Sequence, residues 1–267
     1  MTNEKLYDLA FKFKKTKLWN QLSDTDLFAL PLSNGETGYV CIMGQLGDHF
    51  ALALYVGNEG LDSYRNIAEF ELARTEAEYN EIMVSQNCIQ CAFESKSDLA
   101  PQELEELYGY AKAHGITFKG KNAYPQFKVY RPYRFPWFLR DEEDRQLLYE
   151  ALSAALALAD KLKTSDMRIL GFIGTEPYGR SIPLLQAEGG GYKFSMTELP
   201  PRLKTEFPSP LLRDELLAAR LKRKKKIPSG WVCEVLMVPN PVRHKDDESD
   251  FPEEAPVFPF ILLIVDN

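Results

Sequence analysis

Residues that build disulfide scaffolds and metal centres are scarce in this sequence. Its 267 residues include four cysteines and three histidines, whereas small disulfide-stabilised domains have a far higher density of cysteine. Cys88 and Cys91 have the spacing of a redox dithiol or of half a zinc site, but no second pair completes a zinc site. They also lie in a strand-like run, where residues three apart point to opposite faces. We therefore expect reduced thiols, no metal site and no cofactor.

Long apolar runs and an excess of positive charge are missing too. No stretch approaches 18 consecutive apolar residues, and residues 1–17 contain no apolar signal-peptide core. The 32 basic and 39 acidic residues give a net charge of -7, which disfavours attraction to nucleic acid or to an anionic membrane. These absences predict a cytoplasmic protein that makes no membrane contact.

Common catalytic and nucleotide-binding motifs are absent as well. The sequence has no Gly-x-Ser-x-Gly elbow, no Walker loop, no Rossmann fingerprint and no His-Glu-x-x-His. Three successive glycines at 189–191 join two strand patterns and therefore predict a hairpin turn. Candidates for acid–base or metal chemistry remain in His49 and three loop carboxylates, Glu36, Asp48 and Glu59. The alternative interpretation is that all four are solvated residues of turns.

The residues that are present indicate a globular α+β protein. Hydrophobic residues make up 45% of the chain and aromatic residues 12%. Strand patterns occur in groups rather than alternating with helices, which favours antiparallel sheets packed against helices, in two regions of similar size. The expected strands span residues 27–32, 39–43, 50–56, 167–173, 182–187, 192–196, 231–238 and 260–265, with one or two more within 82–93. The expected helices span residues 1–21, 61–68, 71–79, 101–114 and 141–163, and a last one begins at Ser209.

Three parts of the chain are expected from this order of elements. Residues 1–120 form an N-terminal α+β region that contains a three-strand antiparallel meander. Residues 121–140 form an aromatic and basic connecting segment, and residues 141–267 form a C-terminal α+β region. In the latter, the unbroken apolar run at 260–265 predicts a central strand buried on both faces.

The segment Lys119–Arg140 has the most unusual composition. It holds six basic residues, no acidic residue, seven aromatic residues and three prolines. Aromatic rings and arginines are what single-stranded nucleic-acid binders use, but a proline-stiffened connection that packs its rings on the core has the same composition. Both interpretations stay open. The candidate ligand-binding residues in this segment are Tyr130, Arg131, Tyr133, Arg134 and Trp137.

A second basic run lies at 220–226, where six of seven residues are basic. It can bind phosphates or an acidic partner, or it can be a solvated helix end that the six acidic residues within 246–254 neutralise. Together with the segment Lys119–Arg140, it forms the basis of a nucleic-acid-binding hypothesis.

Several short motifs spread over nearly the whole chain resemble those of a known family. They are Trp19, the runs 26–30, 38–44, 54–57 and 59–61, Tyr124-Pro125, Pro136-Trp137, and the runs 231–234, 239–242 and 258–266. Together they resemble an uncharacterised family of bacterial proteins known only as a domain of unknown function. The resemblance implies a bacterial cytosolic protein and brings no catalytic residues.

Three hypotheses follow for the function. The first is a non-catalytic binding or interaction protein, which has a protein or other partner. The second is a nucleic-acid-binding protein that uses the basic and aromatic segments. The third is a hydrolase-type enzyme that uses Glu36, Asp48 and His49.

Overall fold

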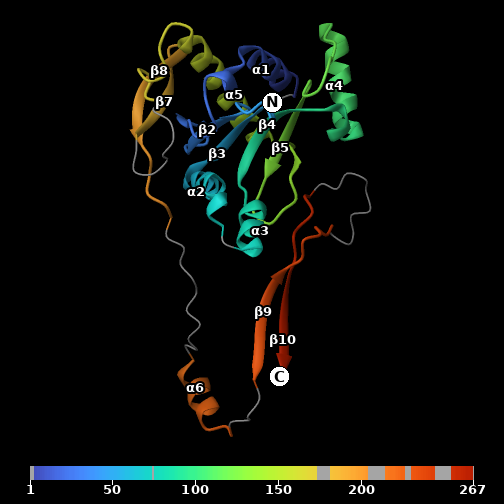
Figure 1. The fold of residues 1–267 in the computed structure, drawn as a ribbon, viewed down its shortest axis with the longest axis vertical. Coiled ribbons are helices and arrows are strands. Elements are labelled where there is room, and N and C mark those ends of the chain that lie inside the picture. The colour runs from blue at the N-terminus through green and yellow to red at the C-terminus, as the bar shows by residue number, and fades with distance from the viewer. Residues whose placement is uncertain are drawn as a thin grey trace. The chain divides into compact units, whose positions relative to one another are not determined.

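The computed structural model describes residues 3–73, 75–172, 181–203, 214–225, 230–243 and 254–266. The chain divides into two compact units, Met1–Arg202 and Leu203–Asn267 (Figure 1). The first unit contains a large sheet covered by helices, and the described part of the second contains one helix and a two-stranded sheet. Helices and strands are thus grouped in an α+β protein, as predicted.

An eight-stranded sheet forms the centre of the first unit, in the order β6-β5-β4-β3-β2-β1-β7-β8. Neighbouring strands are antiparallel except for β1 and β7, which are parallel where Ala29 faces Leu184. The predicted meander is confirmed as β1, β2 and β3, and the predicted hairpin as β7 and β8. The strands are β1 (Phe28–Pro31), β2 (Thr37–Met43), β3 (Ala51–Val56), β4 (Cys88–Glu94), β5 (Tyr124–Tyr130), β6 (Trp137–Phe138), β7 (Ser181–Glu188) and β8 (Gly191–Glu198).

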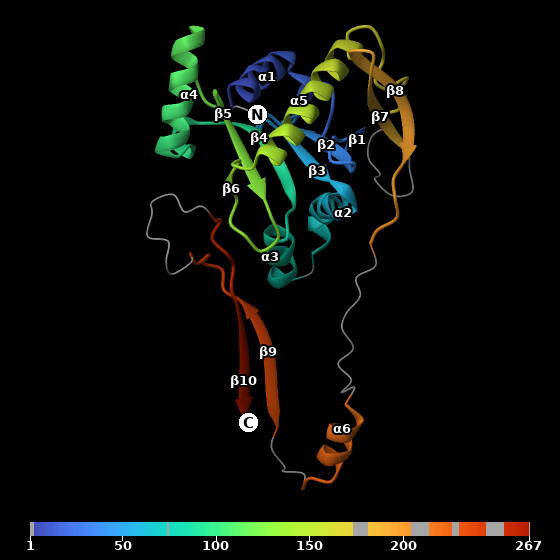
Figure 2. The same cartoon turned by 180° about the vertical axis from the view of Figure 1, so that it is seen from behind.

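Helices cover both faces of this sheet. One face packs against α1, α4 and α5 around the larger core, and Figure 2 shows α1 and α5 side by side there. The other face packs against α2, whose Leu61 and Tyr64 belong to a second core. The predicted helices at 101–114 and 141–163 are confirmed. The helices of the unit are α1 (Asn3–Thr16), α2 (Gly57–Ala68), α3 (Glu76–Val84), α4 (Pro101–His114) and α5 (Glu142–Leu162), with short 3-10 turns η1 (Leu18–Asn20), η2 (Phe70–Leu72) and η3 (Lys96–Asp98).

Sequence signals at its ends explain why α4 forms where it does. Pro101 occupies the first helical position, where a missing N–H costs nothing. The Glu103 carboxylate accepts a hydrogen bond from the Ala100 backbone N–H at 2.8 Å. Gly115 ends the helix with a φ of 64°, a left-handed conformation that glycine adopts without strain. The helix therefore presents a fixed set of side chains beside β5.

The expected connecting segment at 121–140 contributes two strands of the large sheet. Its residues Tyr124–Tyr130 pair with β4 along their whole length, and Trp137–Phe138 pair with β5. The compact unit continues through α5 and the β7–β8 hairpin to Arg202. The apolar side chains of Phe127 and Val129 of β5 are buried in the larger core.

In the first unit, the predicted strand at 167–173 is wrong for its described residues, and the strand predicted within 82–93 is present but begins later than expected. Residues 167–172 form successive turns rather than a strand, because Asp166 and Met167 carbonyls accept hydrogen bonds from the backbone N–H groups of Ile169 and Phe172. Within 82–93, the residues up to Val84 belong to α3, and the strand begins only at Cys88. The strand predicted at 167–173 ends at Ile173, which lies outside the described residues.

In the second unit, the described residues form α6 (Glu215–Lys222) and a hairpin of β9 (Trp231–Met237) and β10 (Phe260–Asp266). The predicted start of the helix at Ser209 lies outside the described residues. The prediction of a central strand buried on both faces is wrong for the described part of the chain. There β10 pairs only with β9, and Ile261–Val265 are 41–59% exposed. Both faces of β10 are apolar, and β9 is its one neighbouring strand among the described residues.

Among the described residues, none of the helices combines the length and the apolar character that crossing a bilayer requires.

Candidate functional site

The five predicted ligand-binding residues lie on β5, on β6 and in the loop between them. Tyr130 is half-buried, and its hydroxyl donates a hydrogen bond to Gln90 Oε1 at 3.0 Å. The amide nitrogen of that Gln90 lies 2.9 Å from His49 Nε2. Burial raises the pKa of Tyr130 to about 12, with Cys88 and Glu94 adding to the shift. Tyr130 is thus a neutral donor that anchors a buried glutamine.

Arg131 forms an ion pair with a side chain of α5. Its Nη2 donates hydrogen bonds to both carboxylate oxygens of Asp144, at 2.7 and 2.8 Å. Asp144 is 10% exposed at its side chain and Arg131 41%. Burial raises the pKa of Asp144, and the Arg131 guanidinium opposes that rise. The contact ties the β5–β6 loop to the first turn of α5.

Tyr133 and Arg134 form the turn of this loop. The Tyr133 hydroxyl donates a hydrogen bond to Glu81 Oε1 at 2.5 Å, and its backbone N–H donates to the Val84 carbonyl at 2.7 Å. The Arg134 N–H donates to the Arg131 carbonyl at 3.0 Å. Trp137 lies edge-on to the next ring, Phe138, with centroids 4.9 Å apart. Three of the five residues, Tyr130, Arg131 and Tyr133, therefore contact three separate groups of neighbours, on β4, α5 and α3.

The acid–base candidates are only partly brought together. His49 Nδ1 lies 3.7 Å from Glu94 Oε1, a neighbour that the sequence did not indicate. Glu36 precedes β2 and lies against Gly57, whereas His49 follows the turn at the far end of the β2–β3 pair. At about 3.3 Å per residue the length of that pair separates them. Asp48 is exposed in the same turn as His49.

Cys88 and Cys91 point to opposite faces of β4, as predicted. Cys88 belongs to the core under α2, and Cys91 to the larger core. Burial raises the pKa of Cys88 to about 12, although Arg131 opposes the rise, and burial raises the pKa of Cys91 as well. Among the described residues, no three His, Cys, Asp or Glu side chains are grouped as metal ligands.

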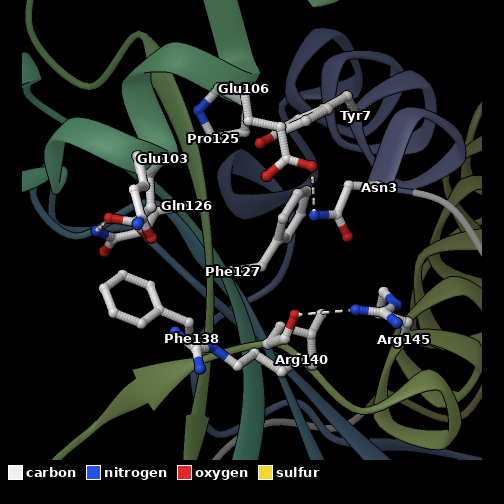
Figure 3. A pocket seen from close by; sticks show the side chains of 12 residues that line it. Asn3, Tyr7, Glu103, Glu106, Pro125, Gln126, Phe127, Phe138, Arg140 and Arg145 are labelled. Carbon is white, nitrogen blue, oxygen red and sulfur yellow. Dashed lines mark hydrogen bonds between the residues drawn. The ribbon is translucent and has the colours of Figure 1, made fainter. Parts of the chain in front are cut away.

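A pocket of about 250 Å³ opens beside β5, near the β6 edge of the sheet (Figure 3). Its walls come from four elements distant in sequence, α1, α4, the β5–β6 pair and α5. Half of the lining belongs to the segment Lys119–Arg140, which the sequence singled out, but through other residues than those predicted. The lining residues are Asn3, Tyr7, Gln102, Glu103, Glu106, Pro125, Gln126, Phe127, Phe138, Leu139, Arg140 and Arg145.

One end of this pocket is basic. Arg145, on the first turns of α5, is half-buried, and its Nη1 donates a long hydrogen bond of 3.4 Å to the Leu139 carbonyl. Its Nε is buried and has no hydrogen-bond partner among the described residues. Arg140 stands over the Phe138 ring, 5.8 Å from its centroid. Within the described part of the chain, neither guanidinium forms an ion pair.

The other end is acidic. Asn3 Nδ2 donates a hydrogen bond to Glu106 Oε1 at 2.7 Å, and Gln126 Nε2 donates to Glu103 Oε2 at 3.1 Å. Since a carboxylate only accepts, the Asn3 amide must offer its nitrogen, which leaves Oδ1 as a free acceptor. This Oδ1 is buried and has no partner among the described residues. Burial, followed by Glu106 and Glu103, raises the pKa of Tyr7.

Few local patterns in the sequence indicate this pocket. Arg140 and Phe138 fall in the segment with unusual composition, so that part was detectable. Asn3, Glu106 and Arg145 lie on three helices, where polar residues on one face are the normal pattern of an amphipathic helix. Only the packing of α1 and α4 beside β5 brings them to one place.

Family comparison connects this fold with a known group of sequences. A family model described as a domain of unknown function, DUF7309, matches residues 4–173. The chain belongs to this family. The DUF7309 match runs from α1 through α5 and includes every lining residue of the pocket except Asn3. No curated protein and no solved structure matches the chain.

Proposed function

We propose that this chain is a non-catalytic binding protein of the bacterial cytoplasm and that its pocket holds a small organic anion. The observation that supports this most directly is Arg145, a half-buried guanidinium whose one hydrogen bond to the described residues is long and goes to a neutral carbonyl. Keeping a charge away from water costs free energy unless an opposite charge or good hydrogen bonds compensate. A bound carboxylate or phosphate would supply both.

The composition of the lining favours binding over covalent chemistry. It includes no serine, cysteine or histidine, so a nucleophile paired with an imidazole base is missing from the described walls. Glu103 is already engaged, since it accepts from the Ala100 N–H and from Gln126. Apolar rings from Phe127 and Phe138 form the middle of the pocket, as in many ligand sites.

The test is calorimetric titration of the full chain with simple organic anions that differ in the attached apolar group. We expect Arg145→Gln to weaken binding by about 10- to 100-fold, because a charge-assisted hydrogen bond contributes about 1.5–3 kcal/mol. Arg168→Gln is the matched control, since Arg168 is exposed and does not line the pocket. Equal binding by both variants, or no binding by the unaltered chain, would contradict the proposal.

A second candidate function, docking of a protein partner, has an observation of its own. Helix α3 has no buried residue in nine, although helices of this length depend on packing for stability. A hollow of about 570 Å³ lies between η2 and α3, rimmed by Glu69, Glu78 and Glu81. Leu72 in it is 73% exposed. An apolar hollow with an acidic rim fits an amphipathic helix with basic residues.

This second function is tested with two synthetic helical peptides that share a leucine face and carry either lysine or glutamate elsewhere. We expect fluorescence anisotropy to show tighter binding of the lysine peptide and a clear loss with Leu72→Ser. Leu46→Ser is the control, because Leu46 is 91% exposed but lies in the β2–β3 turn. Equal affinity for both peptides would argue against docking.

The nucleic-acid hypothesis has less support at the predicted residues. Arg131 already donates two hydrogen bonds to Asp144, which a phosphate would have to replace. Binding of a single-stranded oligonucleotide that weakens steeply with salt would favour it instead.

A further inference from the structure

The two ends of the pocket favour ligand groups of opposite kinds, a hydrogen-bond acceptor at one end and a donor at the other. At the basic end, the donor Arg145 Nε is without an acceptor among the described residues. At the acidic end, the acceptor Asn3 Oδ1 is without a donor in the same part of the chain. Buried polar atoms in proteins normally have hydrogen-bond partners, and a buried atom without one destabilises the fold. Both atoms belong to residues that line the pocket, where a bound molecule is the candidate partner.

From this arrangement we propose that the ligand is a small zwitterion with an apolar body, of amino-acid or dipeptide size. Its carboxylate lies at Arg145 and Arg140, and its ammonium lies at Asn3 and Glu106. The proposal rests on the proposed function, because it names the class of ligand for the same pocket. No covalent step is involved.

The acidic end suits an ammonium for three reasons. The Glu106 carboxylate carries negative charge and lies within hydrogen-bond distance of Asn3. The Asn3 carbonyl oxygen adds an uncharged acceptor beside it. The pKa of Tyr7 rises through burial and through the Glu106 and Glu103 carboxylates, which indicates negative potential at that wall. An –NH3⁺ group has three donors for such acceptors and no lone pair that would be repelled.

The basic end suits a carboxylate, and the middle suits an apolar side chain. A guanidinium presents paired donors that match the two oxygens of a carboxylate. Arg140 is held near this end by its position over Phe138. Figure 3 shows the rings of Phe127 and Phe138 between the acidic and the basic groups. These rings can remove an aliphatic or aromatic ligand side chain from water.

The size of the pocket limits the ligand. About 250 Å³ lies slightly below the volume of sites for drug-sized molecules, about 300–1,000 Å³. A long peptide or a nucleotide with several phosphates does not fit within it. A molecule that carries both charges a few bonds apart, joined by a short apolar body, does.

The experiment is calorimetry of the full chain with leucine and glycyl-leucine, each compared with its N-acetyl and its C-terminal amide derivative. We expect one of the two parent zwitterions to bind and both of its derivatives to bind at least about 10-fold more weakly, since each derivative lacks one charged partner. Glu106→Gln should weaken the parent but leave the N-acetyl derivative unchanged. Arg145→Gln should weaken both.

The control is Glu105→Gln, one residue before Glu106 on α4, exposed and absent from the lining. Thermal unfolding of each variant checks that it is folded. If the N-acetyl derivative binds as tightly as its parent, the zwitterion is wrong while the anion-binding function stands. If neither parent nor any simple anion binds, both proposals fail.

Discussion

The pair of Arg131 and Asp144 shows that a residue predicted to bind a ligand also holds two elements of the fold together. Asp144 is buried at the first turn of α5, and burial raises its pKa. Arg131 opposes that rise and joins the β5–β6 loop to the helix. The Arg131 side chain is partly exposed, but its charge still stabilises the fold, because the Asp144 carboxylate that it contacts is shielded from water.

Replacing Arg131 is therefore predicted to lower the free energy of unfolding by an amount that depends on pH. We expect Arg131→Ala to lower the free energy of unfolding by about 1–3 kcal/mol at neutral pH, because it leaves a buried carboxylate without its cation. Asp144 already has a raised folded pKa, so it is protonated as the pH falls through that value. Below that pKa the Asp144 carboxyl carries no charge, so the loss of unfolding free energy in Arg131→Ala should be smaller. Urea titrations in acid and at neutral pH measure this, and Arg168→Ala should show no such change.

The cysteines give a second prediction for single residues. Cys41, Cys88 and Cys91 are buried, and Cys233 is exposed. Burial raises the pKa of all three buried thiols, which keeps them protonated and unreactive. A thiol reagent should therefore modify Cys233 rapidly in the folded protein and the others only after unfolding. Mass spectrometry of the modified chain identifies the sites, and fast labelling of Cys88 or Cys91 would show that β4 is not buried as described.

Helix α2 follows β3 without a loop, and the close approach of the two elements requires a glycine at position 60. A Cβ built on Gly60 would lie 2.8 Å from the Tyr55 carbonyl carbon, closer than packing allows. Gly60→Ala should thus destabilise the protein by about 1–3 kcal/mol through overpacking.

Gly109→Ala is the opposite case, because nothing lies within 4 Å of its Cβ position in α4. It should stabilise by up to about 1 kcal/mol. Chemical unfolding of both variants tests the pair, and a gain with Gly60→Ala would contradict the close packing.

The elements also show how far the sequence predicts this fold. The stripe of leucine and alanine along α5, and the proline and glycine at the ends of α4, act locally and placed both helices correctly. Residues 167–172 are apolar enough for a strand, but their backbone hydrogen bonds close on neighbouring residues. For β10 the apolar run indicated burial without indicating what would cover it. The pocket depended on contacts between α1, α4 and β5, which no local pattern encodes.

On the scale of the whole molecule, the first unit extends beyond the family match. DUF7309 covers residues 4–173, but β7 and β8 continue the same sheet beside β1. Leu185 of β7 is fully buried in the larger core and Ile182 nearly so in the second. We expect a fragment of residues 1–202 to unfold cooperatively and one of residues 1–173 to be several kcal/mol less stable, since buried leucines and isoleucines contribute about 2–5 kcal/mol each. Equal stability of both fragments in urea would show that the hairpin is dispensable.

The central claim is that the pocket beside β5 binds a small ligand through Arg145. Amide chemical shifts of the isotope-labelled full chain, recorded during titration with leucine, glycyl-leucine and simple organic anions, test it most directly because they report where a ligand binds. We expect changes concentrated at residues 126–127, at 138–140 and around Arg145, and their loss in Arg145→Gln. Changes concentrated elsewhere, for instance at 72–82, or no change with any ligand, would contradict it.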